Sequence, residues 1–191
     1  MNETYNEYEG LAIVTIDKLD DRLWPEALDI YRQAFPEGKP ERIIVAMFRK
    51  NMAYLHVASD ERGVMAMAVT GKVAQGKLLL IDYLAVRSDR QGEGIGQAFL
   101  AAIREWATNE LRAEGLLIEV EYGVTQADEN RLRFWERCGF TLTSYIHKYI
   151  WVPEPYRAMI LALTPNAEIP MDGRKLFKYI GDFHGKAFRE P

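Results

Sequence analysis

The sequence contains little cysteine and has no excess of positive charge. Cys138 is the single cysteine among 191 residues, so no disulfide can form within the chain, and a reducing, cytoplasmic location is expected. Lys and Arg number 24 against 28 Asp and Glu, which gives a net charge of −4. Binding to nucleic acid needs a basic surface or stripe, so nucleic acid is not an expected partner.

Long apolar runs and metal-ligand spacings are also missing. No apolar run approaches the ~20 residues of a membrane-spanning helix. Residues 1–10 are polar and acidic, unlike a signal peptide, so we expect neither membrane insertion nor export. The histidines His56, His147 and His184 have no spacing typical of metal ligands, which predicts that no metal is bound.

Apolar residues make up 48% of the chain, enough to bury one continuous core. We predict one domain over 1–191, with its core at about 11–163 and a C-terminal extension at about 164–191. Strands are expected at 11–16, 53–59, 64–73, 78–86, 116–122, 140–149 and 156–163. Helices are expected at 23–35, 41–50, from 95 until Gly115 ends the helix, at 128–138 and near 175–180.

The connections between these elements predict the sheet. Short turns join strands 53–59, 64–73 and 78–86, so the three must be antiparallel neighbours. A helix separates strand 78–86 from strand 116–122, which predicts a parallel crossover between them. The expected fold class is α/β in the α+β sense: a mixed, largely antiparallel sheet of six or seven strands with helices on both faces. For helix 128–138, Asp128 is the expected N-cap, and Gly139 the C′ residue.

The loop Arg90-Gln91-Gly92-Glu93-Gly94-Ile95-Gly96 lies between a predicted strand and a predicted helix. Glycines let the backbone approach an anion closely, and the free N–H groups and positive dipole end of a helix point at it. Arg87 and Arg90 would add mobile positive charge at the mouth of the loop. An ordinary strand-to-helix turn is the simpler alternative for the glycines alone.

Two other phosphate-binding motifs fit less well. A P-loop needs Gly-x-x-x-x-Gly-Lys followed by Ser or Thr, and the sequence contains none. A dinucleotide-binding unit needs a third glycine where Gln97 or Phe99 stands. Its first strand should also open a parallel sheet, whereas strand 78–86 follows an antiparallel meander.

Two motifs resemble those of the GNAT superfamily of N-acyltransferases. Leu84-Ala85-Val86-Arg87, followed by Gln91-x-x-Gly94-x-Gly96, is similar to the acyl-CoA signature of that family. The run Asn130-Arg131-Leu132-Arg133-Phe134-Trp135-Glu136-Arg137-Cys138-Gly139-Phe140 is similar to its later motif. The resemblance extends from Leu11 to Leu163 and is to bacterial-type members of unknown substrate.

The resemblance implies an N-acetyltransferase in which a primary amine of a small molecule or peptide attacks acetyl-CoA directly, without a metal. The thioester would lie between strands 78–86 and 116–122, which diverge in this family. The backbone of Leu84, Ala85 and Val86 would hold the pantetheine arm, and the Val86 N–H would stabilise the oxyanion. The other implied acetyl-CoA contacts are Arg87, Arg90, Gln91, Gly92, Glu93, Gly94, Ile95, Gly96, Gln97, Asn130, Phe134 and Trp135.

A protonated amine must lose a proton before it attacks, and three carboxylates are candidate bases. Asp82 lies on the motif strand, where alternation predicts that it shares a face with Leu80, Leu84 and Val86, an unusual place for a charge. Glu119 and Glu121 lie on the neighbouring strand. Each of the three could instead be a carboxylate held by Arg or by backbone N–H groups.

The position at which this family often has a proton-donating tyrosine is Trp135, whose indole N–H is not a usable acid. Tyr145 or water could replace it, and a thiolate is already a tolerable leaving group. The alternative function is therefore a non-catalytic CoA-binding or regulatory module on the same fold. A homodimer is the expected quaternary structure.

Overall fold

The computed structural model describes residues 3–8, 11–123, 125–150 and 152–189. Within them, nine strands form one sheet in the order β1-β2-β3-β4-β5-β6-β9-β7, and β8 also pairs with β9. The strands are β1 Glu3–Tyr8, β2 Leu11–Ile16, β3 Tyr54–Asp60, β4 Gly63–Val73, β5 Leu78–Val86, β6 Gly115–Glu121, β7 Thr141–Leu142, β8 His147–Lys148 and β9 Pro155–Ala162. All pairs are antiparallel except β5 with β6.

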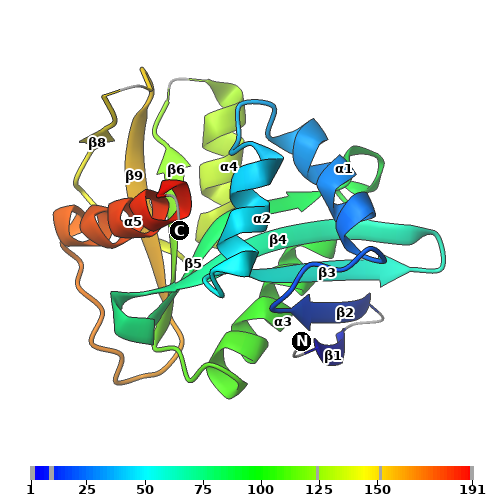
Figure 1. Ribbon diagram of the computed structural model, residues 1–191. Helices are drawn as coiled ribbons and strands as arrows, with labels where there is room; N and C mark the ends of the chain where they lie inside the picture. The colour runs from blue at the N-terminus through cyan, green and yellow to red at the C-terminus, as the bar shows by residue number, and fades with distance from the viewer. Residues whose placement is uncertain (1–2, 9–10, 124, 151, 190–191) are drawn as a thin grey trace.

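Five α-helices cover the two faces of the sheet (Figure 1). They are α1 Trp24–Ala34, α2 Glu41–Arg49, α3 Ile95–Asn109, α4 Gln126–Arg137 and α5 Gly173–Phe188. The first, second and fifth helices share one core with the sheet, and the third helix builds the second core, against which side chains of α4 also pack. The mixed, largely antiparallel fold with helices on both faces is thus confirmed.

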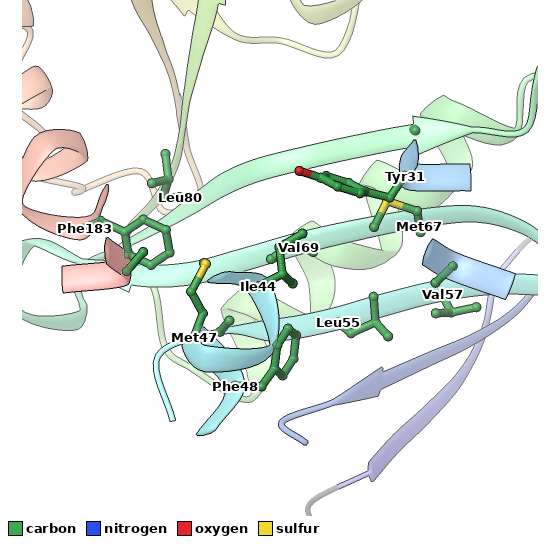
Figure 2. Packing of buried hydrophobic residues seen from close by; sticks show 14 of the residues in the cluster. Tyr31, Ile44, Met47, Phe48, Leu55, Val57, Met67, Val69, Leu80 and Phe183 are labelled. Atoms are coloured by element: carbon green, nitrogen blue, oxygen red, sulfur yellow. The ribbon is translucent and has the colours of Figure 1, made fainter. Parts of the chain in front are cut away.

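Side-chain alternation along the central strands supplies both cores. On β4, Met67 and Val69 face the core of α1, α2 and α5, whereas Ala66 and Ala68 face α3. Figure 2 shows Met47 of α2 and Phe183 of α5 lying close to the β4 and β5 side chains of the first core. The helices are therefore fixed by buried apolar contacts rather than by their loops.

The parallel pair separates early. β5 and β6 pair only at Leu78–Gly115, Leu79–Leu116 and Leu80–Leu117, although both strands continue well beyond these residues. On its other edge, β6 pairs with β9 along its whole length. The expected splay between the two strands is therefore present, with its mouth immediately after Leu80.

Several expected boundaries differ from the structure. The N-terminal strand β1 was not expected, because its sequence, ETYNEY, has no apolar alternation; it forms the edge of the sheet and pairs with β2. The expected strand 140–149 is broken into β7 and β8, which both pair with β9, so the sheet has nine strands rather than six or seven. Helix α3 ends at Asn109, and Gly115 opens β6 instead of ending the helix.

Two helix predictions also need correction. The N-cap of α4 is Thr125, while Asp128 is the N3 partner of a reciprocal capping box. The short helix expected near 175–180 is the sixteen-residue α5, held in the core by Leu176, Phe177, Ile180, Phe183 and Ala187. The glycine expected after α4, Gly139, does take the left-handed conformation, with φ of 92°.

A buried histidine joins two strands of the core and makes stability depend on pH. The His56 ring lies between the hydroxyls of Thr15 and Thr70, at 2.8 and 2.9 Å. Burial lowers the pKa of His56 to about 3. Below its unfolded pKa of about 6.5, only the unfolded chain takes up this proton, so the free energy of unfolding falls as pH falls.

We expect the parent to lose ~1.4 kcal/mol per pH unit from this residue between about pH 6.5 and pH 4.5. A His56→Gln variant should be less stable near neutral pH but should lose less stability over the same window. Urea unfolding at several pH values measures the difference. His147→Gln is the control, because burial also lowers the pKa of His147 but that ring is only half-buried. Equal pH slopes for the parent and His56→Gln would contradict the prediction.

Candidate functional site

The glycine loop opens α3 with backbone conformations that favour glycine. Gly92 and Gly94 have φ values of 87° and 81°, and Gly94 is the N-cap of α3. No side chain caps this helix, and its first turn contains no acidic residue. The first N–H groups of the helix, those of Ile95 and Gly96, therefore remain free to bind an anion at the positive end of the dipole.

The space around the loop suits a ligand. A Cβ atom at Gly92 or Gly94 would meet no atom within 4 Å, whereas one at Gly96 would lie 3.3 Å from the Phe134 ring of α4. Among the backbone N–H groups of residues 91–97, one is already used, because the Gln97 N–H donates to the Gly94 carbonyl at 3.1 Å. The free donors thus cluster before Gln97.

The two arginines of the loop are held by carboxylates. Arg90, only 15% exposed, forms ion pairs with Asp60 at 2.9 Å and Glu93 at 3.0 Å. Arg87 pairs with Asp89 at 2.7 Å. The expectation of mobile positive charge at the mouth was wrong, because nearby acids partly neutralise both guanidinium groups. Backbone N–H groups are therefore the main free donors for a phosphate here.

The free edge of β5 faces the gap. The Arg87 N–H donates to the Met65 carbonyl of β4. Because hydrogen-bonded and non-hydrogen-bonded pairs alternate along an antiparallel ladder, the backbone groups of Leu84 and Val86 point away from β4 and towards the gap. Those of Ala85 point at β4. Gln91 donates its side-chain N–H to the Val86 carbonyl at 3.1 Å, which ties the loop to this edge.

A β-bulge sets the direction of Asp82. The register of β4 with β5 shifts between Val69 and Thr70, so that Asp82 is the extra residue on β5. The expectation that it shares a face with Leu80, Leu84 and Val86 holds for Leu80 but was wrong for Leu84 and Val86. Leu80, Tyr83 and Ala85 face the core of α1, α2 and α5, whereas Leu84 and Val86 face that of α3, and the contacts of Asp82 lie on the first side.

Asp82 lies in a nearly dry ion-pair cluster at the mouth of the gap. Its side chain is 3% exposed, and the Lys39 ammonium contacts both of its oxygens, at 2.8 and 2.9 Å. His184 Nε2 of α5 lies 3.1 Å from Asp82 and 3.5 Å from Glu119. Burial alone would raise the pKa of Asp82, but Lys39 and His184 together hold it below its usual range.

The pKa of Glu119 is displaced in the opposite direction. Burial raises the pKa of its carboxyl above the usual range, against smaller lowering effects of His184 and a 2.6 Å hydrogen bond from the Tyr149 hydroxyl. Burial also raises the pKa of Tyr149, so the phenol stays protonated and donates. Two neighbouring carboxyls with pKa values displaced in opposite directions are typical of acid–base sites.

The third candidate base, Glu121, is paired with side chains outside this cluster. Glu121 forms an ion pair with Arg131 at 2.9 Å and accepts a 3.4 Å hydrogen bond from Tyr156, and it is more exposed than Glu119. The structure thus brings Asp82 and Glu119 together. Glu121 lies two residues further along β6, beside α4.

The remaining expected contacts lie on α4. Phe134 lies against Gly96, Trp135 packs edge to face between Phe134 and Phe140, and Asn130 is exposed on the helix. Trp135 is thus an aromatic packing residue beside the second core. Cys138 is half-buried against the same core, and burial raises the pKa of its thiol.

Three residues of the cluster were not expected from sequence. Lys39 comes from the loop between α1 and α2, Tyr149 follows β8, and His184 lies on α5. None belongs to a motif, and each meets its partner only in the folded chain. Tyr145, the tyrosine considered as a proton donor, packs near Phe177 instead.

No helix in the described part of the chain is long and apolar enough to cross a membrane. In the same residues, no group of three or more His, Cys, Asp or Glu side chains is arranged to hold a metal ion.

Comparisons with known proteins identify relatives of this arrangement. A sequence model described as "Acetyltransferase (GNAT) domain" matches residues 51–142. That segment runs from β3 to β7 and contains β4, β5, the glycine loop, α3, β6 and α4. No protein of curated function matches the chain by sequence.

Solved structures share the fold at low identity. An aminoglycoside 6′-N-acetyltransferase complexed with coenzyme A matches with a TM-score of 0.68 and 13% identity, covering 81% of this chain and 98% of that one. A Bacillus subtilis acetyltransferase in complex with CoA gives 0.60 and 17%, covering 81% and 99%. The Escherichia coli ribosomal-protein-S18-alanine N-acetyltransferase gives 0.56 and 18%, covering 83% and 98%. These likenesses show a common fold.

Proposed function

We propose, from the premise that this chain belongs through residues 51–142 to the GNAT acetyltransferase family, that it transfers an acetyl group from acetyl-CoA to a primary amine of a small molecule or peptide. The observation that carries the proposal is the arrangement around the gap between β5 and β6. The free N–H groups of the glycine loop lie beside the motif strand, and the Asp82–Glu119 pair lies where the strands part.

The acyl donor fits the side of the sheet that carries α3 and α4. Its pyrophosphate would bind to the N–H groups of Ile95 and Gly96 and to the loop before them, where a Cβ at Gly94 would meet nothing. The pantetheine arm would pair with the free backbone edge at Leu84 and Val86. The Val86 N–H then points into the gap, where it can stabilise the oxyanion formed on the thioester carbonyl.

The acceptor amine would approach from the side of α1, α2 and α5. Glu119 is the base that fits best, because burial raises the pKa of this carboxyl, whereas Asp82 is held ionised by Lys39 and Glu121 is paired with Arg131. The amine nitrogen gives a proton to Glu119 and forms a bond with the acetyl carbon. The C–S bond breaks, and the CoA thiolate leaves. The thiolate takes a proton from solvent or from the positively charged nitrogen that is now bonded to the acetyl carbon.

The acetyl acceptor is proposed to be an amine. Two of the structural neighbours are named for amine substrates, an aminoglycoside and the alanine of ribosomal protein S18. Together with the carboxylates at the mouth of the gap, these names support an amine acceptor. A small molecule and a peptide both fit this chemistry.

The test is turnover with a panel of amines. Free thiol released from acetyl-CoA is measured with polyamines, aminoglycosides, amino acids and short peptides, and acetyl-CoA binding is measured by calorimetry. The enzyme should bind acetyl-CoA and release thiol with at least one amine. The alternative, a CoA-binding module without catalysis, is supported by Trp135 at the position of the usual tyrosine and predicts binding without thiol release.

A further inference from the structure

The C-terminal helix α5 brings a titratable side chain to the carboxylate pair, although it lies outside the segment that matches the family. In Figure 1, α5 crosses the face of the sheet in front of β6 and β9, with its C-terminal end beside α2. His184 is in its last turns and is 22% exposed, whereas Asp82 is 3% exposed. His184 therefore lies between the buried cluster and solvent.

The helix does not depend on His184 for its position. The Phe183 ring fills the space that a side chain at Gly71 of β4 would need, so the two elements interlock. Lys50 caps the C-terminal end of the helix, donating from its ammonium to the carbonyls of Lys186 at 3.1 Å, Ala187 at 3.3 Å and also Arg189. Such contacts, together with the buried apolar residues of α5, fix the backbone at position 184.

The position of the His184 imidazole determines which of its nitrogens carries a hydrogen. Nε2 faces two carboxylate oxygens, at 3.1 Å on Asp82 and 3.5 Å on Glu119. Carboxylates are acceptors, so Nε2 must carry a hydrogen in this arrangement. This N–H is hydrogen-bonded to Asp82, and Glu119 lies within ion-pair distance of the same nitrogen.

We infer that His184 is a positioning residue of the proposed acetyltransferase: its Nε2–H bridges Asp82 and Glu119 and holds Glu119 at the mouth of the gap for the acceptor amine. The inference rests on the proposed function and adds α5 to the active site. Asp82 completes the arrangement as the fixed anion, since the Lys39 ammonium contacts both of its oxygens.

The titratable and charged groups around Glu119 determine how its pKa changes when His184 is removed. Besides His184, those that face it come from four further places in the fold: Asp82 and Tyr83 of β5, Lys39 before α2, Tyr149 after β8, and Tyr156 of β9. His184 lowers the pKa of both Glu119 and Asp82. Its removal should therefore raise the pKa of Glu119, and the acid limb of the rate profile should move to higher pH.

The experiment compares His184→Ala, His184→Gln and the parent. With an amine found by the panel, the acid limb of kcat/KM should move up by roughly 0.5–1 pH unit in His184→Ala, with kcat lowered more than KM is raised. His184→Gln keeps an N–H donor and should lie between the two. Asp182→Ala, an exposed change on the same helix, is the control and should match the parent.

A second readout needs no turnover. The carboxyl titration of Glu119 is followed by carbon NMR on glutamate-labelled protein, with the signal assigned by its loss in Glu119→Gln. An unmoved Glu119 titration in folded His184→Ala would overturn the inference, and so would an unmoved acid limb. If no amine supports thiol release by the parent, the proposed function fails, while the NMR titration still decides whether His184 acts on Glu119.

Discussion

Replacing Glu119 by Gln is expected to lower kcat by ~10²–10⁴-fold while acetyl-CoA binding stays close to that of the parent. The amide has nearly the shape of the carboxyl and can still interact with the Tyr149 hydroxyl, 2.6 Å from Glu119 Oε2 in the parent. It cannot accept the proton that the attacking amine loses. Steady-state kinetics with the best amine of the panel, together with calorimetry, measure the two effects separately.

The matched control is Glu121→Gln, two residues further along the same face of β6. Glu121 is paired with Arg131, so losing its charge should change kcat much less. A higher pH should partly restore turnover in Glu119→Gln, because more of the amine is then unprotonated in solution. Full activity of Glu119→Gln at neutral pH would exclude Glu119 as the base and return the role to Asp82 or to water.

Acetyl-CoA binding should be almost completely lost in Gly94→Val, with the fold retained. Position 94 has a φ of 81°, and the space that its Cβ would enter is open in the protein itself. The valine side chain would instead stand where the pyrophosphate must approach the helix N-terminus. Gly96→Val should have the same effect and also press on the Phe134 ring, which would lie 3.3 Å from the new Cβ.

Backbone strain alone must be separated from lost binding. A β-branched residue at positive φ costs of the order of 1–3 kcal/mol wherever it stands. Gly76→Val is the matched control, because Gly76 has a φ of 90°, open surroundings and a place in the turn between β4 and β5. Thermal unfolding should show similar destabilisation of both variants, and calorimetry should show acetyl-CoA binding by Gly76→Val only. Parent-like binding by folded Gly94→Val would remove the main support for the phosphate cradle.

Much of the fold followed from local sequence. β5 was predicted with the bounds that it has, and α3 with its start, because alternation, helical spacing and glycines act over a few residues. β1 and the break between β7 and β8 were missed for the opposite reason. These short edge segments carry weak patterns, and their pairing partners decide whether they form strands.

By itself, the sequence determined the glycine loop, the crossover from β5 to β6 and the candidate carboxylates Asp82 and Glu119, each of which is marked by residues close along the chain. Only the tertiary structure decided that a bulge turns Asp82 towards α5, and that Lys39, Tyr149 and His184 meet Asp82 and Glu119. His184 lies 102 residues from Asp82 along the chain. Contacts between residues so far apart in sequence form only when α5 packs into the core. This packing buries charged side chains, and no local sequence pattern shows that they are paired.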